Sequence, residues 1–335
     1  MNLVENTTFE YDDPEKIKSD ACEKGDVIRF GAIATTLVFC VVMVLSLIGN
    51  LLVIVILLKY ENLKSITNCF IFNLALSDLM FTFGLPFWAH YHHLGQWLLG
   101  DFTCKAVNFV FYAGFYSSVL FLTVMTLQRY RAVVYPLSDR GEKRTCFALS
   151  LSVCIWVVSF AAAMPATLRN KVQVHYNVVH CQYDDINWRH AAAYQQNVFF
   201  FLAFGIMCFC YSKILKTVLK SPTSKRIRTV KLIFVIVVVF VLGWAPHNIV
   251  VFLKTFAHRY PFNECNVNIN LDYAYYVCRL IAYSHCCLNP VFYAFVGVKF
   301  RKHLKVMAKK MTLPQASVES QRTRMVIMPS QGSMY

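Results

Sequence analysis

Residues 30–58 read FGAIATTLVFCVVMVLSLIGNLLVIVILL, a run of 29 residues that contains no Asp, Glu, Lys or Arg. A helix of about 20 apolar residues is long enough to cross the hydrocarbon core of a membrane. Lipid offers no hydrogen-bonding partner to a free backbone group, so a segment of this kind must be helical. This stretch is therefore predicted to be a transmembrane helix.

Similar runs recur along the chain, one of them interrupted only by Asp78. They lack the alternation of polar and apolar residues that is typical of barrel strands. We therefore predict an all-α membrane protein, a seven-transmembrane helix bundle over residues 28–298. The seven predicted spans are 30–58, 65–100, 106–127, 145–168, 191–212, 232–253 and 280–298.

The composition supports a chain whose solvent is largely lipid. Hydrophobic residues make up 57% of the sequence and charged residues 15%, whereas soluble domains carry about 25% charged residues. An enzyme is disfavoured, because no metal cluster, nucleophile triad or phosphate-binding loop is recognisable. A channel or transporter would be expected to show internal repeats and charge pairs within its spans, and neither is found.

The net charge of +15 is distributed in a way that predicts topology rather than nucleic-acid binding. One alternating set of segments between the spans carries 21 Lys and Arg, and the opposite set carries 8. The positive-inside rule then places the N-terminus outside the cell. We expect a multi-pass protein of the plasma membrane whose basic side meets anionic lipid and cytosolic partners. The basic segments are 59–66, 130–145, 213–231 and 297–335.

Four of the thirteen cysteines fall on the predicted outer side: Cys22, Cys104, Cys181 and Cys265. An even number of cysteines in an oxidising compartment predicts two disulfides. Spacing alone leaves three pairings open. A zinc site is the alternative, although no close pair of cysteines supports it.

The outer N-terminal segment, residues 1–27, is acidic although the whole chain is basic. It carries eight acids and three lysines, a net charge of −5. An acidic segment favours a basic ligand through electrostatic steering; a solvated tail without a ligand is the alternative. Tyr11, Asp12 and Asp13 form a plausible sulfation site, and Asn6 begins a glycosylation sequon.

Polar residues within the spans are costly in lipid and should face the interior of the bundle. They occur in five motifs, each on its own helix: Gly49-Asn50, Leu74-Ala75-Leu76-Ser77-Asp78, Gln128-Arg129-Tyr130, Trp244-Ala245-Pro246 and Asn289-Pro290-Val291-Phe292-Tyr293. In this order and on these helices, the set resembles the rhodopsin-like G-protein-coupled receptors.

Further motifs narrow the resemblance. Leu85-Pro86-Phe87-Trp88 and His285-Cys286-Cys287 look like those of chemokine receptors, as do the additional cysteines Cys22 and Cys265. Residues 228–234 and 284–287 are most similar to the XC (lymphotactin) branch of that family. The resemblance covers about residues 20–311.

Membership of that family would imply a receptor that binds an extracellular basic chemokine and activates a heterotrimeric G protein of the inhibitory class to direct cell migration. It implies the disulfides Cys104–Cys181 and Cys22–Cys265. Arrestin and receptor kinases would be further partners. No cofactor is expected apart from an allosteric sodium ion, whose ligands by resemblance would be Asp78, Ser118 and Asn289.

The resemblance also suggests roles for single residues. The expected ligand contacts are Tyr11, Asp12, Asp13, Trp88, Tyr112 and Arg279. Arg279 stands where many chemokine receptors have glutamate, so it would prefer a carboxylate or carbonyl group of the ligand; an ion pair with Asp272 or an acid of the second outer loop is the alternative. The residues expected to carry activation and G-protein coupling are Arg129, Tyr130, Trp244, Pro246, Asn289, Pro290 and Tyr293.

One position departs from the family pattern. Most chemokine receptors have an aspartate before the arginine of the third helix, and this chain has Gln128. The loss of that carboxylate predicts a weaker restraint on Arg129 and therefore higher basal signalling. It also leaves open a second function, that of an atypical chemokine scavenger without G-protein coupling.

After the last span, residues 299–311 place Phe300, Leu304, Met307 and Met311 opposite Lys and Arg side chains. This pattern predicts an amphipathic helix on the membrane surface. Residues 312–335 are polar and are predicted to form a disordered cytoplasmic tail.

Overall fold

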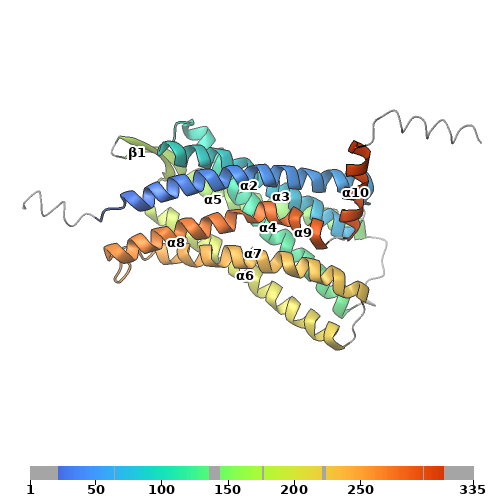
Figure 1. Ribbon diagram of the computed structural model, residues 1–335. Helices are drawn as coiled ribbons and strands as arrows, with labels where there is room; N and C mark the ends of the chain where they lie inside the picture. Colours follow the sequence, from blue (N-terminus) through green and yellow to red (C-terminus); the bar gives the residue numbers. More distant parts are fainter. Residues whose placement is uncertain are drawn as a thin grey trace, which may run out of the picture.

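The computed structural model describes residues 22–63, 65–135, 144–175, 177–220, 224–296 and 298–312. These residues form a bundle of long helices that run side by side (Figure 1). Among them, six helices are long and apolar enough to cross a membrane. The six are α2 Gly25–Tyr60, α3 Ile66–Leu94, α4 Gly100–Val134, α5 Arg144–Arg169, α6 Ile186–Lys220 and α7 Ser224–Lys254.

The seventh predicted span consists of two helices in succession, α8 Cys265–Tyr283 and α9 His285–Val296. The regular bonding pattern is interrupted at Ser284, whose backbone N–H reaches the carbonyls of both Leu280 and Ile281 at 3.2 Å. The helix also begins earlier than the run of residues 280–298 indicated. Residues 265–272 include three asparagines and one aspartate, and they extend the helix beyond its apolar portion. A search for charge-free apolar runs therefore does not find this part of the helix.

Pro290, inside α9, leaves one backbone carbonyl of the last span without its helical partner. Proline has no backbone N–H, so it cannot bond the carbonyl four residues earlier, which is that of Cys286. In the structure this carbonyl accepts hydrogen bonds from Asn50 Nδ2 at 2.8 Å and Ser46 Oγ at 3.2 Å, both on α2. Polar side chains of the first span thus donate hydrogen bonds to the backbone carbonyl of the last span that Pro290 leaves without a partner.

The centre of the bundle is an aromatic core around Trp244, which is fully buried. Its ring lies 4.3 Å from that of Phe115 and makes an edge contact with Phe81 at 6.3 Å, centroid to centroid. Gly114 lets α4 approach α3 closely here, since a Cβ at this position would lie 2.8 Å from the backbone nitrogen of Phe81.

A β-hairpin lies at one end of the bundle. The sequence did not predict this hairpin. Strand β1 Asn170–His175 pairs with β2 Val178–Tyr183 in antiparallel register. Asn177, in the turn, has φ of 62°, a left-handed conformation that asparagine tolerates better than most residues. The Cys104–Cys181 disulfide attaches β2 to α4, and Cys22–Cys265 attaches the segment before α2 to α8. We call this end of the bundle the disulfide end.

The other end carries α10 Val298–Thr312, which lies across the bundle (Figure 1). His303 of α10 stacks on Tyr60 at 5.1 Å between ring centroids and lies 3.2 Å from Glu61. The helix is therefore held against the end of α2. Its position on a membrane surface stays a prediction, and the tail from residue 313 lies outside the described residues.

Candidate functional site

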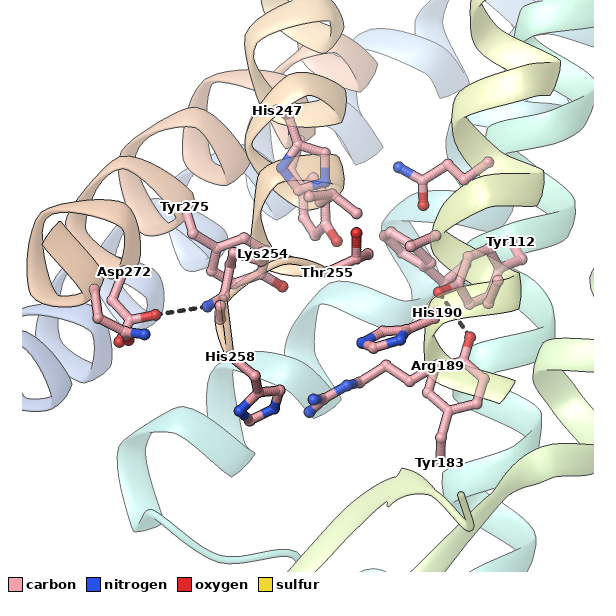
Figure 2. A pocket seen from close by; sticks show the side chains of 18 of the residues that line it. Tyr112, Tyr183, Arg189, His190, His247, Lys254, Thr255, His258, Asp272 and Tyr275 are labelled. Atoms are coloured by element: carbon pink, nitrogen blue, oxygen red, sulfur yellow. Dashed lines mark hydrogen bonds and ion pairs between the residues drawn. The ribbon is translucent and has the colours of Figure 1, made fainter. Parts of the chain in front are cut away.

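A cavity of about 490 Å³ opens at the disulfide end. Its walls come from α4, β2, α6, α7 and α8, together with Lys24 just before α2. Tyr112 and Tyr183 meet on one side, where the Tyr183 hydroxyl donates to that of Tyr112 at 3.0 Å (Figure 2). His247 and Tyr275 line another part of the wall. The cavity thus combines aromatic surface with polar groups, as ligand sites commonly do.

An ion triad closes one side of this cavity. Lys24 and Lys254 each lie 2.7 Å from a carboxylate oxygen of Asp272. Burial works against ionisation of this carboxyl group, but the two lysines outweigh it and hold the pKa of Asp272 below its ordinary value of 3.8. The triad joins α7 and α8 to the segment that follows Cys22.

Arg279 lies behind the cavity wall and is not among the residues that line it. It is 7% exposed, and its guanidinium stacks on Tyr275 and Tyr276 at 5.3 and 5.2 Å. One nitrogen donates to Thr35 Oγ1 at 2.8 Å. The alternative, an ion pair with Asp272 or an acid of the second outer loop, is not found among the described residues, where the carboxylate of Asp272 is bound by Lys24 and Lys254.

Trp88 is likewise not among the residues that line the cavity. Its ring lies 6.0 Å from Tyr91 and 5.9 Å from Trp97. Trp97 is buried against the Cys104–Cys181 disulfide. Trp88 thus supports the place where the hairpin is attached to α4.

Deep in the bundle, three of the predicted polar residues meet. Asp78 is fully buried and accepts hydrogen bonds from Asn289 Nδ2 at 2.7 Å and Ser118 Oγ at 3.3 Å. His285 Nε2 lies 3.8 Å from the same carboxylate and has no hydrogen-bond partner. Carboxylate and hydroxyl oxygens are ligands that a small, hard cation prefers, and Asp78 and Ser118 present one of each here.

At the end away from the disulfides, Arg129 contacts α3. Its guanidinium donates to Thr67 Oγ1 at 2.5 Å, and Gln128 Nε2 lies 3.5 Å from the same oxygen. Arg129 has no ion pair with an acid among the described residues. Thr67 therefore accepts the hydrogen bond from Arg129 that a carboxylate at position 128 would otherwise accept.

Two kinds of comparison place the chain among known proteins. Residues 49–293 match the family described as 7 transmembrane receptor (rhodopsin family). The chain is 45% identical to Chemokine XC receptor 1 of Homo sapiens over 301 residues, which is 90% of this chain and 88% of that protein. It is 43% identical to the Mus musculus protein of the same name (92% and 93%) and 37% identical to C-C chemokine receptor type 3 of Cavia porcellus (85% and 81%).

The chain belongs to the chemokine receptor family. It is accordingly a G-protein-coupled receptor of the seven-transmembrane class with a chemokine as its ligand and a G protein as its partner, and it is not an enzyme. The fold predicted from the charge-free runs is confirmed.

Only some of the predicted site residues of this chemokine receptor line the cavity. Of the expected ligand contacts, Tyr112 lines the cavity, whereas Trp88 and Arg279 are not among its lining residues. Tyr11, Asp12, Asp13 and the sequon at Asn6 lie outside the described residues, and so does the side chain of Tyr293.

Sequence reasoning missed several polar residues of the cavity, among them Lys24, Arg189, Lys254 and Asp272. Lys and Arg at the ends of spans had been counted only as topology signals. For Arg189 and Lys254, the signal that could have identified them was their position at the ends of α6 and α7, near aromatic residues further along each helix.

Proposed function

We propose that this receptor binds a chemokine of the XC class at its disulfide end, facing the cell exterior, and activates an inhibitory-class G protein at the other end. The observation that carries the proposal is the similarity to two proteins named Chemokine XC receptor 1, which covers at least 90% of this chain. The cavity at the disulfide end supports it, because its volume of about 490 Å³ and its aromatic and polar lining suit an inserted peptide segment.

The ligand would make two contacts. The body of a basic chemokine would dock on the acidic N-terminal segment, at Tyr11, Asp12 and Asp13, since complementary charge favours the encounter. That segment ends at Cys22, which is bonded to Cys265, and Lys24 follows in the cavity wall. A chemokine held by this segment would be placed to insert its own N-terminal residues into the cavity.

Binding in the cavity would act on the aromatic core below it. Tyr112 lies 5.2 Å from Phe111, and Phe111 is in contact with Phe81 at 4.9 Å. Phe81 and His247 both contact Trp244. A ligand that prefers one arrangement of these rings shifts the population of receptor states, and α7 would move about Pro246.

The deeper residues would then respond in turn. A sodium ion at Asp78, Ser118 and Asn289 would stabilise one arrangement of α3, α4 and α9. Asn289, Pro290 and Tyr293 would allow α9 to move, and Arg129 and Tyr130 would meet the G protein. Phosphorylation of Ser and Thr in the tail by receptor kinases would recruit arrestin, and α10 would contact lipid of the plasma membrane.

The test is G-protein activation in cells that express the chain, challenged with an XC chemokine beside a panel of CC and CXC chemokines. We expect inhibition of cyclic AMP formation by the XC chemokine alone, and loss of the response in Arg129→Ala at matched surface expression. A response to other classes but not to the XC chemokine would contradict the ligand assignment.

The second candidate function is an atypical scavenger, which Gln128 favours because it replaces the usual acid beside Arg129. Uptake of the chemokine without G-protein activation would establish it. Gln128→Asp would then be the variant to examine for recovery of coupling.

A further inference from the structure

The charges that line the cavity are predominantly positive. Lys24, Arg189 and Lys254 face it, with Asp272 as the one acid among its lining residues. Both lysines are already bound to that acid at 2.7 Å. A ligand ammonium group would therefore find no free carboxylate on this wall, and it would meet a net positive charge of about two.

Arg189 differs from the two lysines because it has no acidic partner among the described residues. It lies in the first turn of α6 and is exposed to solvent. In Figure 2 its guanidinium points toward His258 and away from Asp272. Burial and the neighbouring charges of Arg189 and His258 lower the pKa of His190, so these groups are close enough to influence one another.

A buried polar atom supplies a second, independent observation. His247 lines the same cavity, is 3% exposed, and its Nδ1 has no hydrogen-bond partner. Buried polar groups are satisfied in most structures, and an unsatisfied one costs free energy. An acceptor or donor brought in by the ligand would remove that cost.

We propose that the cavity binds the carboxylate of an acidic side chain in the chemokine's N-terminal segment, with Arg189 and His258 as its partners near the mouth and His247 as a hydrogen-bonding group deeper in. This rests on the proposed function, namely that a chemokine inserts its N-terminal segment here. The receptor then uses opposite charges for two parts of one ligand, acidic for the body of the chemokine and basic for its tip.

The experiment uses the full chain and a series of XC chemokine variants. Each chemokine residue that precedes the first cysteine of the chemokine is changed in turn to Glu and to Gln. These two side chains differ in charge but hardly in size. The concentration for half-maximal G-protein activation is measured for each pair. For at least one position we expect the Glu form to be more potent than the Gln form by about five-fold, the range of a partly exposed ion pair.

The receptor variants assign the effect to Arg189. Arg189→Gln should bring the two forms to within about two-fold, and its surface expression, measured beside that of the parent, shows that the variant is folded. Arg259→Gln is the matched control, because Arg259 is an exposed arginine of the same end that does not line the cavity. It should keep the full difference.

Two results would overturn the proposal: a Gln form at least as potent as the Glu form at every position, or a Glu preference that survives Arg189→Gln. A failure of the proposed function looks different, because the unaltered receptor would then give no response to the unaltered XC chemokine. That outcome would remove the basis of this inference as well.

Discussion

Thr67→Ala should raise the basal activity of the receptor. The Thr67 hydroxyl is the hydrogen-bond acceptor that the structure gives to the Arg129 guanidinium, at 2.5 Å, and Gln128 Nε2 lies 3.5 Å from the same oxygen. Arg129 Nε already lacks a partner. Removing the hydroxyl takes away the contact that holds Arg129 against α3 and away from a G protein.

The size of the effect follows from the type of bond. A hydrogen bond that involves a charged group contributes about 1.5–3 kcal/mol. Arg129 is only partly buried, so the lower end of that range applies. A change of about 1.4 kcal/mol alters a population ratio roughly tenfold, and we expect the ratio of active to inactive receptor to rise by about that factor.

The assay is ligand-independent inhibition of cyclic AMP formation, compared at matched surface expression. Thr123→Ala is the control, since the Thr123 hydroxyl bonds the Val119 carbonyl of its own helix at 2.8 Å and is similarly lost on substitution. Gln128→Asp, which supplies a carboxylate beside Arg129, should lower the basal signal instead. Unchanged or reduced basal activity in Thr67→Ala would refute the reasoning, and so would an equal rise in Thr123→Ala.

Three further predictions concern stability, measured by thermal unfolding of the purified receptor in detergent. Gly114→Ala should cost about 1–3 kcal/mol through overpacking against Phe81, whereas Gly205→Ala, with no atom within 4 Å of its new Cβ, should be neutral or slightly stabilising. Asn50→Ala should cost about 1–2 kcal/mol, because the Cys286 carbonyl loses its shorter hydrogen bond; an unchanged melting temperature would show that this bond is replaceable. The pKa of Asp272 is lowered, so its bridge stabilises the receptor above pH 3.8 and is lost as the pH falls through the lowered pKa. Asp272→Asn should therefore be less stable near pH 7 and lack this loss in acid, and a variant with the same acid transition as the parent would contradict the assignment.

The seven-helix fold could be predicted because it rests on sums over about 20 residues, in which single exceptions such as Asp78 matter little. The interruption at Ser284 could not, since it depends on how a few backbone groups near Pro290 find partners on α2. The β-hairpin at residues 170–183 was missed for a similar reason: a short pair of strands in a loop is a weak signal beside the long helices.

The candidate site was predictable where a residue type is unusual for its surroundings. Asp78, Ser118 and Asn289 are polar groups in apolar spans, and the structure brings them together. Thr67 gave no such signal, because threonine is common at the end of a helix. Arg279 was identified as unusual, but only the packing of its guanidinium against Tyr275 and Tyr276 shows that it stands behind the cavity lining.

The segment that ends at the bond between Cys22 and Cys265 affects the occupancy of the second ligand contact. Cys22 is eleven positions after Tyr11 in the sequence, so Tyr11 can lie no more than about 40 Å from the bond. A chemokine held by that segment is confined to a half-sphere of that radius, which corresponds to an effective concentration on the order of 10 mM at the cavity. Even a weak contact of the chemokine tip would then be occupied most of the time. Because α2 begins at Gly25, three residues after Cys22, cleaving the disulfide would lengthen the tether by only a few residues and lower this effective concentration about twofold.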